Sequence, residues 1–310
     1  MTSTEIHVRI SLNRNFATMS HALVRSLAAK AAFPGDWQVV FTVGLDTDQD
    51  LKSPMLAWAK DYPVEFRWVE RDLFDAYGHV GTRLQCIQHE HLADAVLIMD
   101  ADVLATGSLA ELIEQVATSD AVVGRPAWRP PPDVDLVEFL RGSGLPAHGY
   151  GLTYQGHGIV PSLPRECPPY LNFGHIALSR DIARHMARTF GEDVTFVEKN
   201  YRSYFNDQLA LCLNVARNRY RCLPMDLKYN MGNGAAAPLA IVATLEAAVA
   251  YAQRLNAMLD RRVIHYCNTS ADFDKARDLD GWDRLQAFCD RTDVRGVGNV
   301  LLQMGFRAFL

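Results

Sequence analysis

Val96-Leu97-Ile98-Met99-Asp100-Ala101-Asp102-Val103 is the stretch in which a continuous apolar run meets two acidic residues. The apolar run indicates a buried strand. Residues i and i+2 of an extended chain project from the same face, so both carboxylates can meet one cation at the carboxyl end of this strand. The small Ala101 between them leaves room for a ligand. A structural alternative is that the two acids cap the helix that follows, as Asp102 could do in part.

The surrounding sequence alternates short apolar runs with helical patterns. Within the first 124 residues, runs rich in Val, Ile and Phe predict strands at Ile6–Ser11, Gln38–Val43, Val64–Val69, Ala95–Met99 and Ala121–Gly124. Helical patterns lie between them, at about 17–30, 50–61, 81–93 and 108–117. Alternation of this kind predicts an α/β fold with a mostly parallel central sheet flanked by helices. In such sheets ligands bind at the carboxyl ends of the strands.

The pattern changes between residues 125 and 170, where prolines and glycines predict a long irregular insertion. Further strands are expected at His175–Leu178, Arg221–Leu223 and Val263–Tyr266, and helices near 180–190, 205–217 and 239–258. A length of 310 residues suits one domain that carries an insertion better than two independent domains.

Composition limits the partners and the compartment. The formal net charge of -5 argues against nucleic-acid binding, which needs a basic face. The six cysteines form no CxxC pair, and charged Glu5 and Arg9 near the amino end argue against a secretory signal. The apolar stretch Pro238–Tyr251 contains Glu246 and is short for a transmembrane segment. We therefore expect a cytoplasmic protein, with the apolar run Val300–Leu310 docked on the core or, as the less favoured alternative, touching the inner face of a membrane.

Further polar motifs follow in order along the chain. Arg83 lies 17 residues before Asp100, in a helix that leads into the same strand. The segments LNFGH (171–175), NDQ (206–208) and VIHY (263–266) come later. These ordered motifs, from Ile6 to His265, resemble glycosyltransferase family 8, the retaining sugar transferases of the GT-A fold.

The resemblance implies a role for each matching residue. Asp100, Asp102 and His265 match the family's ligands for manganese, or magnesium, which holds the diphosphate of the donor. Arg83 matches an arginine placed against the donor phosphate or sugar, and Asn172 and Gly174 match a segment that lines the sugar pocket. The remaining matches are Asp207 and Gln208, beneath the transferred sugar, and Ser11, Leu12 and Asn13, in a loop that contacts the nucleotide. Taken alone, His265 on an apolar strand is more often a buried structural histidine.

The resemblance also implies an organisation of the single domain. Residues 1–124 would form the nucleotide-binding half, 125–170 the irregular insertion, and 171–310 the acceptor side with C-terminal helices. The partners would be a nucleoside diphosphate sugar, with UDP as the nucleotide, and a sugar, glycolipid or small-molecule acceptor.

Two departures from the family pattern bear on mechanism. Lys275 comes late after the histidine motif and lacks the following Pro-Trp, so its contact with the diphosphate is in question. Leu209 stands where the family often has an acid, which leaves Asp207 as the only carboxylate near Gln208. Gln208 is a poor nucleophile, so we expect front-side attack on the donor, with Gln208 supporting the oxocarbenium-like sugar. A catalytically silent nucleotide-sugar-binding protein and a sugar nucleotidyltransferase remain the alternatives.

Overall fold

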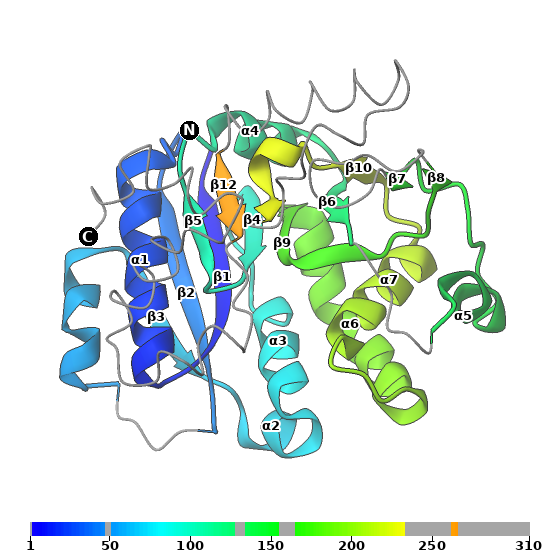
Figure 1. Ribbon diagram of the computed structural model, residues 1–310, viewed down its shortest axis with the longest axis horizontal. Coiled ribbons are helices and arrows are strands. Elements are labelled where there is room, and N and C mark those ends of the chain that lie inside the picture. Colours follow the sequence, from blue (N-terminus) through cyan, green and yellow to red (C-terminus); the bar gives the residue numbers. More distant parts are fainter. Residues whose placement is uncertain (1, 47–50, 128–133, 155–164, 233–261, 266–310) are drawn as a thin grey trace, which may run out of the picture.

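A seven-stranded sheet forms the centre of the computed structural model, which describes residues 2–46, 51–127, 134–154, 165–232 and 262–265 (Figure 1). The strand order is β10-β6-β9-β4-β1-β2-β3. All neighbouring strands are parallel except β9, which is antiparallel to both β4 and β6. The strands are β1 (Thr4–Ser11), β2 (Trp37–Gly44), β3 (Val64–Trp68), β4 (Ala95–Met99), β6 (Val122–Pro126), β9 (Leu171–Ser179) and β10 (Cys222–Pro224).

The register brings the carboxyl ends of the central strands to one edge. Ser11 at the end of β1 pairs with Gly44 at the end of β2, and Val8 pairs with Met99 at the end of β4. The polar segments that follow these three strands are therefore neighbours, as expected for a parallel sheet.

Helices cover both faces of the sheet and enclose two apolar cores. One core joins the sheet to α1 (Arg14–Lys30), α4 (Ala110–Thr118) and the 3-10 helix η1 (Pro54–Asp61). The other joins it to α3 (His79–Ile87), α5 (Leu136–Gly142), α6 (Arg180–Asn200) and α7 (Asn206–Asn218). Alternating residues of β4 divide between them, since Leu97 belongs to the first core and Val96 and Ile98 to the second.

Two smaller sheets complete the described structure. β5 (Val103–Ala105) pairs antiparallel with β12 (Val263–His265), which pairs parallel with β11 (Met231–Gly232). β7 (Thr153–Tyr154) pairs with β8 (Arg165–Glu166), and the 3-10 helix η2 spans Leu227–Tyr229. The β5–β12 pairing sets the backbone of His265 beside that of Val103, directly after the two acids.

Glycine allows a sharp corner between α2 (Arg71–Tyr77) and α3. Gly78, between the two helices, has a φ of 55°, a conformation that glycine adopts without a steric penalty. Gly81 then packs so closely that a Cβ there would lie 2.3 Å from the carbonyl oxygen of Leu73. This corner lies against the sheet because α3 contacts both β1 and β2.

The predicted α/β architecture with a mostly parallel sheet is confirmed, while several element boundaries differ. The helix expected at 81–93 ends at Ile87, and α2 precedes it as a separate helix. The segment expected as a helix at 50–61 is the 3-10 helix η1, which begins at Pro54. The insertion at 125–170 holds α5, β7 and β8. The helix expected at 239–258 and the run Val300–Leu310 lie outside the described residues. Among the described helices, none is long and apolar enough to cross a bilayer.

Candidate functional site

A cleft of about 640 Å³ opens at the carboxyl edge of the sheet. This volume is typical of sites for small molecules. Five parts of the chain contribute its polar lining: the end of β1 and the loop after it, the segment after β2, the α2–α3 corner, the segment after β4, and the end of α6 with the loop after it. These polar residues are Arg9, Ser11, Asn13, Asp46, Tyr77, His79, Thr82, Asp100, Asp102, Glu198, Ser203 and Tyr204.

Asp100 and Asp102 both line this cleft, one residue apart after β4. The backbone N–H of Asp100 donates to the carbonyl oxygen of Gly174 at 2.8 Å. The Asp100 carboxylate forms an ion pair with the guanidinium of Arg83. Asp100 is therefore held through its backbone by β9 and through its side chain by α3, while Ala101 between the acids is buried.

Arg83 lies behind the cleft rather than in its lining. Its side chain is only 1% exposed, and its Nε lies 3.6 Å from an Asp207 carboxylate oxygen. The guanidinium also stacks over the ring of Phe173, 4.8 Å from the centroid. The family resemblance implies that Arg83 lies against the donor. In this structure two carboxylates and an aromatic ring hold its guanidinium inside the protein.

Asp207 connects a second arginine to the same network. Its carboxylate lies 3.2 Å from the guanidinium of Arg9, which lines the cleft. Burial alone would lower the pKa of Arg9, but the carboxylates of Asp207 and Asp100 raise it above its ordinary value. Two acids and two arginines thus form one charged group between the cleft floor and the amino end of α7.

Gln208 and Gly174 are buried and Asn172 is half-buried, and none of the three lines the cleft. The Gln208 side-chain oxygen accepts a hydrogen bond from the backbone N–H of Phe173 at 3.1 Å. The Asn172 side-chain oxygen accepts from the backbone N–H of Gly174 at 2.9 Å. Both contacts fix the start of β9, the strand that holds the backbone of Asp100.

The segment after β1 divides between the cleft and the core. Ser11 lines the cleft, and its hydroxyl donates to Asp46 at 2.7 Å. Asn13 also lines the cleft and caps α1 by accepting from the N–H of Phe16 at 3.1 Å. Leu12 is fully buried in the first core because its side chain is apolar.

The resemblance also implies roles for His265 and Lys275. The backbone of His265 lies beside that of Val103 through the β5–β12 pairing. Lys275 lies outside the described residues.

Several residues that line the cleft were missed in the sequence analysis. Arg9 and Ser11 are two residues apart on β1 and so project from the same face, which the sequence already indicates. Asp46 follows β2 at the same sheet edge, but it had no counterpart in the family pattern. Tyr77 and His79 reach the cleft through the α2–α3 corner, and Tyr204 through the loop between α6 and α7. No local pattern in the sequence indicates those contacts.

Comparisons with known proteins identify the fold. No protein-family model matches the sequence, and no curated protein matches it. Among solved structures, the galactosyltransferase LgtC in complex with donor and acceptor sugar analogs is similar, with a TM-score of 0.55 and 15% identity over 99% of this chain and 100% of that chain. Mouse xyloside xylosyltransferase 1 has a TM-score of 0.51 and 12% identity over 86% of this chain and 98% of that one.

The bifunctional glycosyltransferase WbbM is also similar, with a TM-score of 0.57 and 16% identity over 94% of this chain. This chain spans 50% of the length of the WbbM chain. At these identities the likeness establishes a shared fold, and it confirms the expected GT-A-type architecture.

Proposed function

We propose that this protein is a metal-dependent retaining glycosyltransferase. It moves a hexosyl group from a nucleoside diphosphate sugar, with UDP as the nucleotide, to a carbohydrate, lipid or small-molecule acceptor. The observation that carries the proposal is the position of Asp100 and Asp102, which line a cleft at the carboxyl ends of parallel strands. The fold agrees with it, since LgtC, which shares this fold, has been solved with donor and acceptor sugar analogs.

The residues present suit a divalent cation. Asp100 and Asp102 provide carboxylate oxygens to the cleft. His265 lies on β12, whose pairing with β5 sets its backbone beside Val103, the residue after Asp102. Oxygen ligands with one imidazole suit manganese and tolerate magnesium. Asp100, Asp102 and His265 would hold the ion, which when bound would offset the negative charge of the donor diphosphate.

The protein groups around the cleft would orient the donor and exclude water. Ser11, Asn13 and the backbone at Leu12 would contact the nucleotide, and the small Ala101 would let the diphosphate approach the acids. Arg83 would act as a positioning residue, because its ion pair fixes the Asp100 carboxylate. Gln208 lies behind the cleft lining and would support the sugar in front-side attack through its hydrogen bond to the start of β9. Asp207 would hold Arg9 and Arg83 beside it. Asn172 and Gly174 would keep the sugar side of the cleft in place through β9.

The experiment is a panel of nucleoside diphosphate sugars, assayed for release of the nucleoside diphosphate with manganese, with magnesium and after chelation. We expect release with manganese and its loss on chelation. Asp102→Asn should lower the rate by roughly a hundredfold, comparable with the loss of another electrostatic contact in an active site. Asp181→Asn, an exposed change in the first turn of α6, should leave the rate unchanged and serves as the matched control.

Calorimetry on the same panel separates the alternatives. Tight binding of a donor without release of the diphosphate would favour a silent binding protein. Formation of the activated sugar from a sugar phosphate and a nucleoside triphosphate would favour a nucleotidyltransferase. Activity that survives both chelation and Asp102→Asn would contradict the metal role.

A further inference from the structure

One face of β1 is polar along its whole length. Its other face places Ile6, Val8 and Ile10 in the first core. The polar face carries Glu5, His7, Arg9 and Ser11, which is unusual for a strand that lies between two parallel neighbours. Arg9 and Ser11 belong to the cleft described above. Glu5 and His7, at the amino end of the strand, have no part in it.

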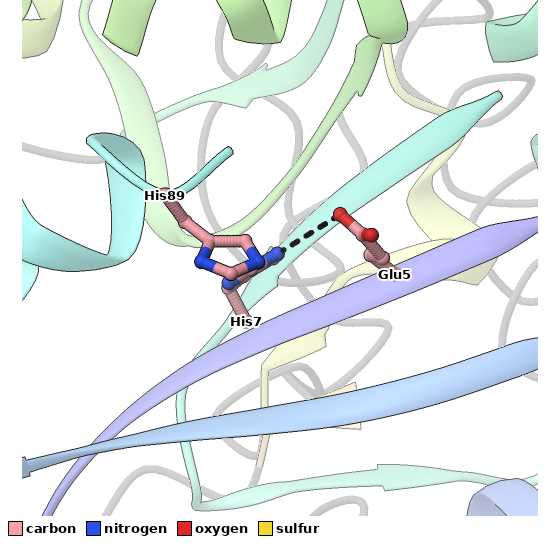
Figure 2. Close-up of side chains that lie close together, drawn as sticks. All are labelled: Glu5, His7 and His89. Carbon is pink, nitrogen blue, oxygen red and sulfur yellow. Dashed lines mark hydrogen bonds and ion pairs between the residues drawn. The ribbon is translucent and has the colours of Figure 1, made fainter. Parts of the chain in front are cut away.

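Glu5 and His7 form a cluster with His89, which follows α3 (Figure 2). One ligand atom from each of the three side chains can be chosen so that all lie within 4.8 Å of one another. His7 is fully buried, and its Nε2 lies 3.5 Å from a Glu5 carboxylate oxygen. Its other ring nitrogen is also buried and has no hydrogen-bond partner within the described part of the chain. The rings of His7 and His89 are 4.8 Å apart.

We propose that Glu5, His7 and His89 bind one divalent transition-metal ion of the zinc class. Two imidazoles and one carboxylate are a common zinc ligand set in which the fourth position is open to water. The set is richer in nitrogen than the Asp100–Asp102 site, so the two sites should select different ions. Tetrahedral zinc places its ligand atoms about 3.3 Å apart. A small change of side-chain rotamers would therefore close the cluster around the ion.

The charges in the cluster suit a cation. The Glu5 carboxylate supplies a negative charge beside the two imidazoles. The guanidinium of Arg67 now lies against the His89 ring and is also bound twice by Glu65. The positively charged Arg67 guanidinium therefore already contacts the His89 ring. A bound metal would take its place while Arg67 stays paired with Glu65.

An ion could reach the cluster from solvent. His7 and His89 line a cavity of about 230 Å³ together with Arg67, Gln85 and Gln88. The Nδ1 of His91 lies 3.6 Å from a Glu5 carboxylate oxygen, where it can orient the carboxylate. The ion would tie the start of β1 to the segment after α3, so its binding should raise thermal stability. The inference does not depend on the proposed transfer reaction.

The test is a zinc titration of the metal-free protein, with excess manganese present to occupy the Asp100–Asp102 site. We expect one zinc per chain and a higher melting temperature. Glu5→Gln and His89→Ala should each weaken zinc binding by on the order of tenfold or more. Asp102→Asn, at the other site, and His185→Ala, an exposed histidine of α6, should bind zinc as the unchanged protein does.

Circular dichroism of each metal-free variant checks that it is folded before titration. Should His89→Ala fail to fold, the isosteric Glu5→Gln provides the comparison on its own. Cobalt added in place of zinc gives a spectroscopic readout, in which intense visible bands would indicate tetrahedral coordination. The proposal is overturned if the unchanged protein binds no stoichiometric zinc, if zinc binds equally well to Glu5→Gln, or if Asp102→Asn alone abolishes the binding.

Discussion

Asp207 is the residue on which two arginines of the site depend. Its carboxylate lies 3.2 Å from Arg9 and 3.6 Å from Arg83, and its side chain is 6% exposed. Asp207→Asn keeps the shape but leaves two neighbouring positive charges without this partner. Removing one member of a buried ion pair costs about 3–5 kcal/mol of unfolding free energy. We expect a loss of about 3 kcal/mol in urea unfolding, because Arg83 keeps its contact with Asp100.

The exposed pair of Arg71 and Asp75 provides the matched control for this prediction. These side chains are 71% and 62% exposed, with the charged atoms 3.9 Å apart. Asp75→Asn should change the unfolding free energy by less than about 0.5 kcal/mol, because water screens exposed pairs. If Asp207→Asn were as mild as Asp75→Asn, the two arginines would not depend on Asp207.

The positions of single residues in the site differ in how well the sequence predicts them. Asp100 and Asp102 were visible because a buried strand runs directly into them, and their place in the cleft follows from strand geometry. The depth of Arg83 could not be predicted, because it depends on Phe173 and Asp207, which are distant in sequence. The cluster of Glu5, His7 and His89 was missed, although alternation along β1 already placed the first two on one face.

The α2–α3 corner supplies the prediction at the scale of elements. In a helix, alanine is favoured over glycine by about 1 kcal/mol. At Gly81 an added Cβ would lie 2.3 Å from the Leu73 carbonyl oxygen, and such overpacking costs about 1–3 kcal/mol. We expect the clash to dominate, so Gly81→Ala should lower the unfolding free energy by up to about 2 kcal/mol. Donor affinity should fall as well, because Tyr77 and His79 of this corner line the cleft.

Gly142, the last residue of α5, is the control for that change. Nothing lies within 4 Å of a Cβ built there. Gly142→Ala should therefore stabilise the protein by up to about 1 kcal/mol, through reduced freedom of the unfolded chain. Equal effects of the two substitutions on denaturant unfolding would show that α2 and α3 can separate without cost.

Elements were predicted well where the apolar period was clear. β4 has the predicted bounds, Ala95–Met99, because every residue in it is apolar and buried. α2 was missed because its seven residues are too few to show a helical period, and its fold depends on packing against α3. β9 was expected as a short strand, yet it runs from Leu171 to Ser179 because it pairs on both sides, with β4 and β6.

At the scale of the molecule, strand–helix alternation predicted the architecture because a parallel sheet needs helical crossovers. The same reasoning could not show that β9 runs antiparallel between β4 and β6. Strand direction depends on how the chain returns from the insertion, which has no sequence signature. The formal net charge of -5 likewise argued against broad nucleic-acid binding without indicating where the charges lie. In the structure, acidic groups lie both at the cleft and at the start of β1.

Global stability should depend on pH through Asp193, a buried residue of α6 that contacts α7. Burial raises the pKa of Asp193 from 3.8 to about 6, although Asn214 and Arg217 contact its carboxylate. The folded state therefore binds more protons than the unfolded state between these values, so this group lowers the unfolding free energy as pH rises from about 4 to 6. At about 1.4 kcal/mol per unit, the loss is at most about 3 kcal/mol. Asp193→Asn cannot ionise, so urea unfolding should show its stability rising relative to the unchanged protein over this range. A difference that stays constant from pH 4 to 7 would mean that Asp193 titrates alike in both states.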